Sequence, residues 1–300
     1  MTALKPSSFT TLGTGGGPMP DPLRAQPAHL LMVRNMPVLI DCGEGAMAQL
    51  RKAGVDYRNL DHIFLTHHHF DHIGSLFACI GLNMMIHRKR MLTIYGPPGT
   101  SQIVEGLIAA CSVPQEIGFG NTDRQLPHPR DFVTVREMRP SDVIQLEGCR
   151  VTCCENTHYL SEEDAGTSAH LSLSLRFDLD DRSVVFTGDT GPCRAVEDLA
   201  RGADLLVGEL VDAESVIARF RRVNPEATQE GVDRIARHMT EHHMSAEQLG
   251  EMAARAGVAE VVAVHFTNGA VTAQNADSFR QRVESRFSGK VHMGEDTASY

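Results

Sequence analysis

The stretch Ile63-Phe64-Leu65-Thr66-His67-His68-His69-Phe70-Asp71-His72 decides the fold. It joins an apolar run to a dense cluster of ionisable side chains. Only one register fits the pattern H-x-H-x-D-H: it begins at His67, because a register that began one residue later would need a histidine at Phe70. Imidazole nitrogens and carboxylate oxygens are suitable ligands for a borderline metal such as zinc. The stretch therefore predicts a metal site, of dinuclear type, at the end of a strand.

The composition is that of a soluble globular protein. The chain has 300 residues, of which 42% are hydrophobic and 22% are charged. Its net charge of −10 argues against broad binding of a phosphate backbone, which needs an excess of Lys and Arg on one face. The seven cysteines include no C-x-x-C pair, so we expect reduced thiols rather than a disulfide framework. No stretch reads as a signal peptide or a membrane span, and a cytoplasmic location is expected.

Strands and helices alternate along the chain without a linker or a shift in composition. Strands are predicted at 8–12, 30–33, 38–41, 63–65, 91–95, 133–137, 143–145, 150–155, 170–177, 183–187, 205–209 and 261–264. Helices are predicted at 46–53, 75–86, 100–110 with Thr100 as its cap, 193–201, 212–223, 225–242, 246–256 with a capping box of Ser245 and Gln248, and 273–287. Residues 114–130 read as a long loop that serves as a lid or a substrate wall. The glycines at 13–17 indicate a turn that lets the backbone approach the site, because no Gly-Lys-Ser/Thr follows.

Four of the predicted strands deliver a metal-type ligand just past their carboxyl ends. These ligands are His67, His158, Asp189 and His265. In α/β folds this edge of the sheet is where sites gather, because rigid strands position short loops there. Four such ligands together favour a metal site far more than any single motif does.

With these residues in view, the chain resembles the metallo-β-lactamase superfamily over nearly its whole length. The stretch 66–74 matches the signature of the superfamily. The branch that looks most similar contains tRNase Z and the zinc arylsulfatases, and the residues that carry this likeness are Phe186-Thr187-Gly188-Asp189-Thr190, Glu209, His243-Met244-Ser245-Ala246-Glu247-Gln248 and Val264-His265-Phe266. The resemblance implies a four-layer αββα sandwich, formed by residues 1–300 as a single hydrolase domain.

The resemblance also implies the roles of the site residues. His67, His69 and His158 would bind one Zn²⁺, while Asp71, His72 and His265 would bind a second, with Asp189 as the bridge; Mn²⁺ or Fe could replace zinc. A hydroxide shared by the two metals would attack the substrate, and Asp71 could orient it. His243, assisted by Glu209, would protonate the leaving group. His170 is the rival of His158 as third ligand, and His68 and Phe70 are expected to be spacers that point away from the metals.

The sequence departs from true tRNase Z enzymes in ways that bear on the substrate. His158 and Asp189 are only 31 positions apart, too few for the Gly/Pro-rich arm that grips tRNA, and the His-Glu-Ala element reads Gly208-Glu209-Leu210. With the negative charge, this predicts a small ester as substrate: an arylsulfate or phosphodiester first, then a lactone or β-lactam. Nucleic acid and membrane are not expected as partners, and the resemblance allows a homodimer. The alternatives are a tRNA 3′-processing endoribonuclease and an iron-dependent oxidoreductase of the same superfamily.

Overall fold

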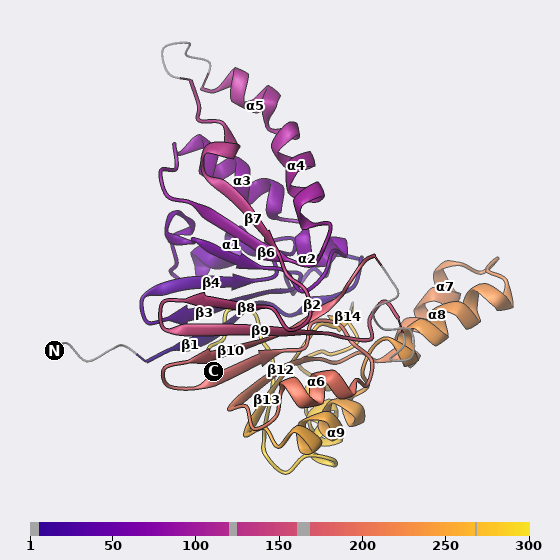
Figure 1. Cartoon of the computed structure of the whole chain (residues 1–300). Coiled ribbons are helices and arrows are strands. Elements are labelled where there is room, and N and C mark those ends of the chain that lie inside the picture. The colour runs from indigo at the N-terminus through magenta and orange to yellow at the C-terminus, as the bar shows by residue number, and fades with distance from the viewer. Residues whose placement is uncertain (1–5, 120–124, 161–168, 268) are drawn as a thin grey trace. The chain divides into compact units, whose positions relative to one another are not determined.

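The computed structural model of the chain describes residues 6–119, 125–160, 169–267 and 269–300 (Figure 1). The chain divides into two compact units. The first consists of Met1–Gly13, Pro22–Met138 and Glu295–Tyr300, and the second of Thr14–Asp21 and Arg139–Gly294. Each unit is described by itself, and the single domain expected for residues 1–300 stays a prediction.

The first unit is built on a six-stranded sheet in the order β1-β3-β4-β5-β6-β7. β1, β3 and β4 pair antiparallel, whereas β4 to β7 run parallel. The parallel strands β4 and β5 are mostly buried, as expected of strands covered on both faces. The strand bounds are Ser8–Gly13 (β1), Ala28–Val33 (β3), Met36–Ile40 (β4), His62–Phe64 (β5), Leu92–Gly96 (β6) and Val133–Glu137 (β7).

Three helices of the first unit, α1, α3 and α4, bury one face against an apolar core that includes Leu39, Ile63, Ile80 and Ile94. The helices of this unit are Ala46–Lys52 (α1), Phe70–Ile73 (α2), Leu76–Met85 (α3), Thr100–Ala110 (α4) and Ser112–Ile117 (α5), with 3₁₀ turns at Tyr57–Asn59 (η1) and Pro129–Asp131 (η2).

Two local predictions in this unit are wrong. The cap of α4 is Gly99, whose φ of 102° suits glycine, and the Thr100 hydroxyl instead donates to the carbonyl of Pro97. The predicted loop at 114–130 begins inside α5, because a proline is tolerated in the first turn of a helix, and it contains η2. Residues 120–124 of that stretch lie outside the described residues.

The second unit is built on a seven-stranded sheet in the order β15-β13-β12-β11-β10-β9-β8. Its strands β11, β12, β13 and β15 are parallel, and β8 to β11 pair antiparallel. The bounds are Val143–Leu146 (β8), Cys149–Glu155 (β9), Leu173–Leu179 (β10), Ser183–Phe186 (β11), Leu205–Glu209 (β12), Glu260–Val264 (β13) and Lys290–Met293 (β15). Gly15–Gly16 (β2) and Phe266–Thr267 (β14) form a separate pair, and neither that pair nor β15 was expected.

The helices of the second unit are of two kinds. α6 (Arg194–Leu199), α9 (Ala246–Ala256) and α10 (Ala276–Glu284) contribute buried residues to the core. The predicted capping box of Ser245 and Gln248 is present in α9. α7 (Ala213–Val223) and α8 (Gln229–Glu241) lie side by side as a hairpin (Figure 1), in which Val232 is buried. No helix among the described residues is long and apolar enough to cross a membrane, and the cytoplasmic location stays a prediction.

Candidate metal centre

The ligand-type residues of the first unit gather between β5 and α2. His67 and His72 are buried, with 0% and 2% of their surface exposed, and Asp71 is buried as well. The Nε2 atom of His67 lies 3.2 Å from Nδ1 of His69, so these two imidazoles converge as the alternating pattern predicts. His68 turns away, as expected of a spacer, and its Nε2 lies 2.8 Å from the Thr100 hydroxyl.

Asp41 follows β4 and holds two of these histidines in place. No sequence motif indicated this role. One of its oxygens, Oδ2, accepts a hydrogen bond of 2.8 Å from Nδ1 of His72. The carboxylate also accepts from the amide and the hydroxyl of Thr66, at 2.8 and 2.9 Å. Since the hydroxyl proton goes to Asp41, the Thr66 oxygen accepts from Nδ1 of His67, 3.0 Å away. Both rings thus carry the Nδ1 proton, which puts the lone pair on Nε2, where a metal would bind.

The ligand-type residues of the second unit lie at the carboxyl ends of its strands. His158 follows β9, Asp189 follows β11 and His265 follows β13, and at most 4% of each is exposed. Oδ2 of Asp189 lies 3.0 Å from Nε2 of His265 and 3.8 Å from Nε2 of His158. One carboxylate oxygen therefore faces two imidazoles, which is the arrangement that a bridging ligand requires.

Two backbone contacts orient the histidines of the second unit. His158 donates from Nδ1 to the carbonyl of His242 at 3.2 Å, which leaves the lone pair on Nε2. A Cβ atom at Gly16 would lie 2.4 Å from Nδ1 of His265, so only glycine fits there. The expected close approach of the glycine turn to the site is thus seen at His265. His265 itself has a φ of 61°, in the left-handed region.

His243 and Glu209 form a buried pair beside Asp189 and His265. The Nδ1 atom of His243 donates to Oε2 of Glu209 at 2.7 Å. Burial is the largest single influence and lowers the pKa of His243, but the charge and hydrogen bond of Glu209, together with the charge of Asp189, raise this pKa above its ordinary value. Burial raises the pKa of Glu209, and His243 opposes that rise. The pair therefore provides an imidazole that holds its proton firmly at Nδ1.

Two further histidines bear on the site, and one of them, His238, lies elsewhere than expected. His238, on α8, reads as structural or exposed in the sequence, yet its ring centroid lies 5.7 Å from that of His158 and 5.0 Å from that of His243. A lone histidine on a polar amphipathic helix gives no sequence signal for this. His170, the rival of His158, is exposed.

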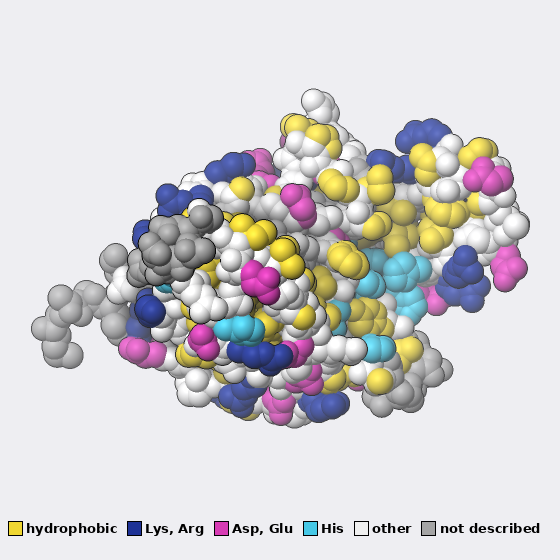
Figure 2. Space-filling view, turned by 90° about the horizontal axis from the view of Figure 1, so that it is seen from above, with side chains coloured by type: hydrophobic (Ala, Val, Ile, Leu, Met, Phe, Trp, Pro, Cys, Tyr) yellow, Lys and Arg dark blue, Asp and Glu magenta, His cyan; other side chains and the backbone are white. Residues whose placement is uncertain are grey.

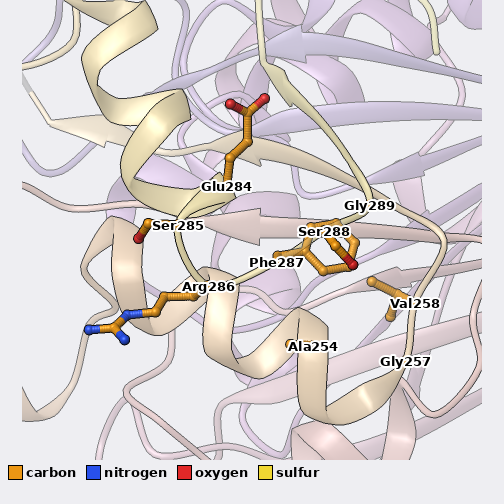
Figure 3. Close-up of a pocket in the computed structure, with 9 residues that line it drawn as sticks. All are labelled: Ala254, Gly257, Val258, Glu284, Ser285, Arg286, Phe287, Ser288 and Gly289. Carbon is orange, nitrogen blue, oxygen red and sulfur yellow. The ribbon is translucent and has the colours of Figure 1, made fainter.

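The donor chemistry fits a borderline divalent metal. Both units present histidines whose Nδ1 is engaged by a carboxylate, hydroxyl or carbonyl, together with buried carboxylates, and this is the pattern of metal-binding histidines. A surface hollow elsewhere in the second unit, of about 490 Å³, contains none of these donors (Figure 3). It lies between the end of α9 and the turn after α10, and residues such as Gly257, Arg286 and Phe287 line it.

Comparisons with known proteins agree with this chemistry. The family model described as the β-lactamase superfamily domain matches residues 37–266. The chain therefore belongs to the metallo-β-lactamase superfamily, and it is a hydrolase of that class. It is 30% identical to a protein of Mycobacterium avium (strain 104) named ribonuclease Z, and the match covers 96% of this chain and 95% of that one. A ribonuclease Z of Mycobacterium sp. (strain KMS) is 31% identical, over 96% and 93% of the two chains.

Solved structures show the same fold. The metallo-β-lactamase fold protein YhfI of Bacillus subtilis has a TM-score of 0.72 at 19% identity, with 99% of each chain covered. The short form of human tRNase Z has a TM-score of 0.67 at 19% identity, with 98% of each chain covered. The predicted metallo-β-lactamase fold, the superfamily with its ribonuclease Z branch, and the prediction of an enzyme are confirmed.

The predicted partner is wrong. We expected a small-molecule ester and argued against nucleic acid, but the full-length relatives are named ribonuclease Z. The error comes from the −10 charge and the short interval before Asp189. A net charge averages over the whole surface and does not describe the part that meets a substrate. The general prediction of a hydrolase holds, and the small-ester substrate has no support.

Proposed function

We propose that this hydrolase is a ribonuclease Z-like endonuclease that removes the 3′ trailer of precursor tRNA. The names of the full-length relatives support this substrate. So does the fold that the chain shares with the short form of human tRNase Z. The observation that carries the proposal is the buried pair of His243 and Glu209, which suits protonation of a ribose oxygen as it leaves phosphorus.

We propose further that the two sets of ligands act together on two zinc ions. One zinc would be held by His67, His69 and His158, and the other by Asp71, His72 and His265, with Asp189 shared. The contacts of Asp189 with both His158 and His265 support a bridging role. Bound zinc supplies Lewis acidity and a water that loses its proton near neutral pH. Asp71 would orient that water, as a buried carboxylate beside His72 can do.

The residues of the chain have separate tasks in the cleavage. As the bond between phosphorus and the leaving 3′ oxygen breaks, Nε2 of His243 would give its proton to that oxygen. The bond from Nδ1 to Glu209 fixes the ring and stabilises the charged imidazole before the transfer. Glu209 is itself held by a hydrogen bond from the amide of Thr190, so the pair keeps its orientation.

The charge distribution indicates how RNA would be bound. Among the described residues on the face shown in Figure 2, Lys and Arg side chains are interspersed with Asp and Glu, and apolar side chains lie between them. Phosphate contacts alone supply affinity only where basic side chains gather. Since basic side chains do not gather on this face, RNA bound there would need contacts with its bases as well as with its phosphates.

The decisive experiment uses precursor tRNA with a 3′ trailer. The purified protein, stripped of metal and then given back zinc, should cleave after the acceptor stem only in the second state. His243→Ala should bind the same RNA and the same amount of zinc but cleave it far more slowly. Absence of metal-dependent cleavage would overturn the proposed function, and stoichiometric iron in the purified protein would favour the oxidoreductase alternative.

A further inference from the structure

Phe70 is exposed in a chain that otherwise buries most of its phenylalanines. Its exposed fraction is 83%, whereas the six largest buried aromatic side chains are each below 2%. Those six are Phe9, Phe64, Phe132, Phe177, Phe186 and Phe266. Burial of an aromatic ring is favourable because the ring is transferred out of water, and an exposed ring does not gain this free energy. A partner that covers the ring would recover it.

The backbone beneath this ring is held firmly. Phe70 is the first residue of α2, and the amide of His72 donates to the carbonyl of His69 at 2.9 Å. The amide of Cys42 donates to the carbonyl of His72 at 2.7 Å, which ties α2 to the end of β4. A Cβ atom at Gly43 would lie 2.1 Å from the carbonyl oxygen of Asp71, so the two segments touch there. The ring is therefore presented to solvent from a rigid base.

The position of Phe70 in the chain connects it to the proposed site. It stands between His69 and Asp71, two of the proposed ligands, and its Cα is about 3.8 Å from each of theirs. A phosphate bound at these ligands would bring the adjoining nucleotides close to the ring. Every base has an aromatic face, and stacking on a protein ring stabilises single-stranded RNA without regard to sequence.

We propose that Phe70 is a stacking platform for the nucleobase next to the scissile phosphate. This inference rests on the proposed function and names how its substrate is gripped. It suits a chain with a net charge of −10, because base stacking does not depend on net charge. It also gives the spacer position of the H-x-H-x-D-H stretch a role apart from the metals.

The test measures the energetic coupling between the Phe70 ring and one base of the substrate. Precursor tRNAs carry a single abasic nucleotide at each position flanking the cleavage site, and kcat/KM is measured for the wild type, Phe70→Ala and Phe70→Leu. We expect one abasic position to lower the kcat/KM of the wild type about tenfold, the typical size of one stacking contact. On intact RNA, Phe70→Ala and Phe70→Leu should each lower kcat/KM by the same factor. On RNA that is abasic at that position, their kcat/KM should equal that of the wild type. Phe70→Tyr should restore the wild-type pattern.

Controls separate the ways in which this inference could fail. Phe119→Ala removes another exposed ring, 69% exposed, and should show no coupling to any abasic position. Zinc content should be equal in the wild type and all three Phe70 variants, which shows that the neighbouring ligands are intact. If the losses in kcat/KM from the Phe70 variant and from the abasic nucleotide multiply at every position, the role of Phe70 in stacking is overturned. It is also overturned if the wild type sediments as an oligomer that dissociates in Phe70→Ala, because the ring would then be covered by a second copy of the chain. A wild type that cleaves no RNA would overturn the proposed function itself.

Discussion

Nδ1 of His72 lies 2.8 Å from Oδ2 of Asp41, and both side chains are almost fully buried. Through Thr66 the same carboxylate also orients His67. Two histidines of the first unit thus depend on one residue that binds no metal in our proposal. Partners of this kind set the tautomer and the basicity of a ligand.

Asp41→Asn should therefore weaken zinc binding about 10- to 100-fold, because the amide cannot accept all of these hydrogen bonds in the same way. Competition between the metal-free protein and a chelating dye measures this affinity. Asp233→Asn, on the exposed face of α8, is the matched control. Equal affinity in Asp41→Asn and the wild type would contradict the role of Asp41.

The two neighbouring histidines of the signature should behave in opposite ways. His69→Ala should lose zinc and activity, since His69 lies against His67 and is a proposed ligand. His68→Ala should keep both, because its ring is bonded to Thr100 instead. Zinc content of the purified variants is the measurement, and loss of zinc in His68→Ala would show that the register is wrong.

His243→Ala should lower the rate of the chemical step about 10²- to 10⁴-fold, the usual contribution of a general acid. Single-turnover cleavage of precursor tRNA isolates that step. Zinc content should not change, since His243 is not among the proposed ligands. Thr240→Ala, near the end of α8, serves as the control. If His243 had only a structural role, His243→Ala would be less stable than the wild type but would cleave at the same single-turnover rate.

Arg88 should contribute strongly to stability. Its guanidinium donates to the carbonyls of Leu60, Met91 and Arg90 and to the carboxylate of Asp61. Only 5% of its surface is exposed. Arg88→Leu removes the donor to these carbonyls and one of the two arginines paired with Asp61, and it should lower the free energy of unfolding by about 2–4 kcal/mol. Urea unfolding measures it, and the exposed Arg51→Leu should change it by less than about 0.5 kcal/mol.

The cysteines should be unreactive in the native protein. Burial raises the pKa of Cys79, Cys149 and Cys153 to about 12, so few thiolates exist near pH 8. Ellman's reagent should react slowly with the folded chain and with all seven thiols once urea unfolds it. A rapid reaction before unfolding would reveal an exposed thiol.

Local sequence patterns predicted much of the fold and of the candidate site. The H-x-H-x-D-H stretch has a fixed spacing, and the capping box of Ser245 and Gln248 is a local exchange of hydrogen bonds, so both can be read without the rest of the chain. The convergence of Asp189 and His265 was predictable because each follows a parallel strand, and such strands end at one edge.

Other features depend on contacts between distant residues. A single aspartate after β4 has no signature, so the bonds from Asp41 to Thr66 and His72 could be seen only in the folded chain. The same is true of His238, whose helix looks polar in sequence. The four residues of β15 are too few to show a periodic pattern. The substrate was missed because the net charge of a chain is a sum, whereas binding is local.

The backbone at Asp41 and at His265 has φ values of 57° and 61°, a region that side chains with a Cβ enter at a cost in free energy. If folding stability were the only requirement, glycine or asparagine would suit these two positions better. Each instead carries a side chain that the proposed chemistry needs. At these two positions, substitutions chosen to raise thermal stability would therefore be expected to lower the rate of turnover.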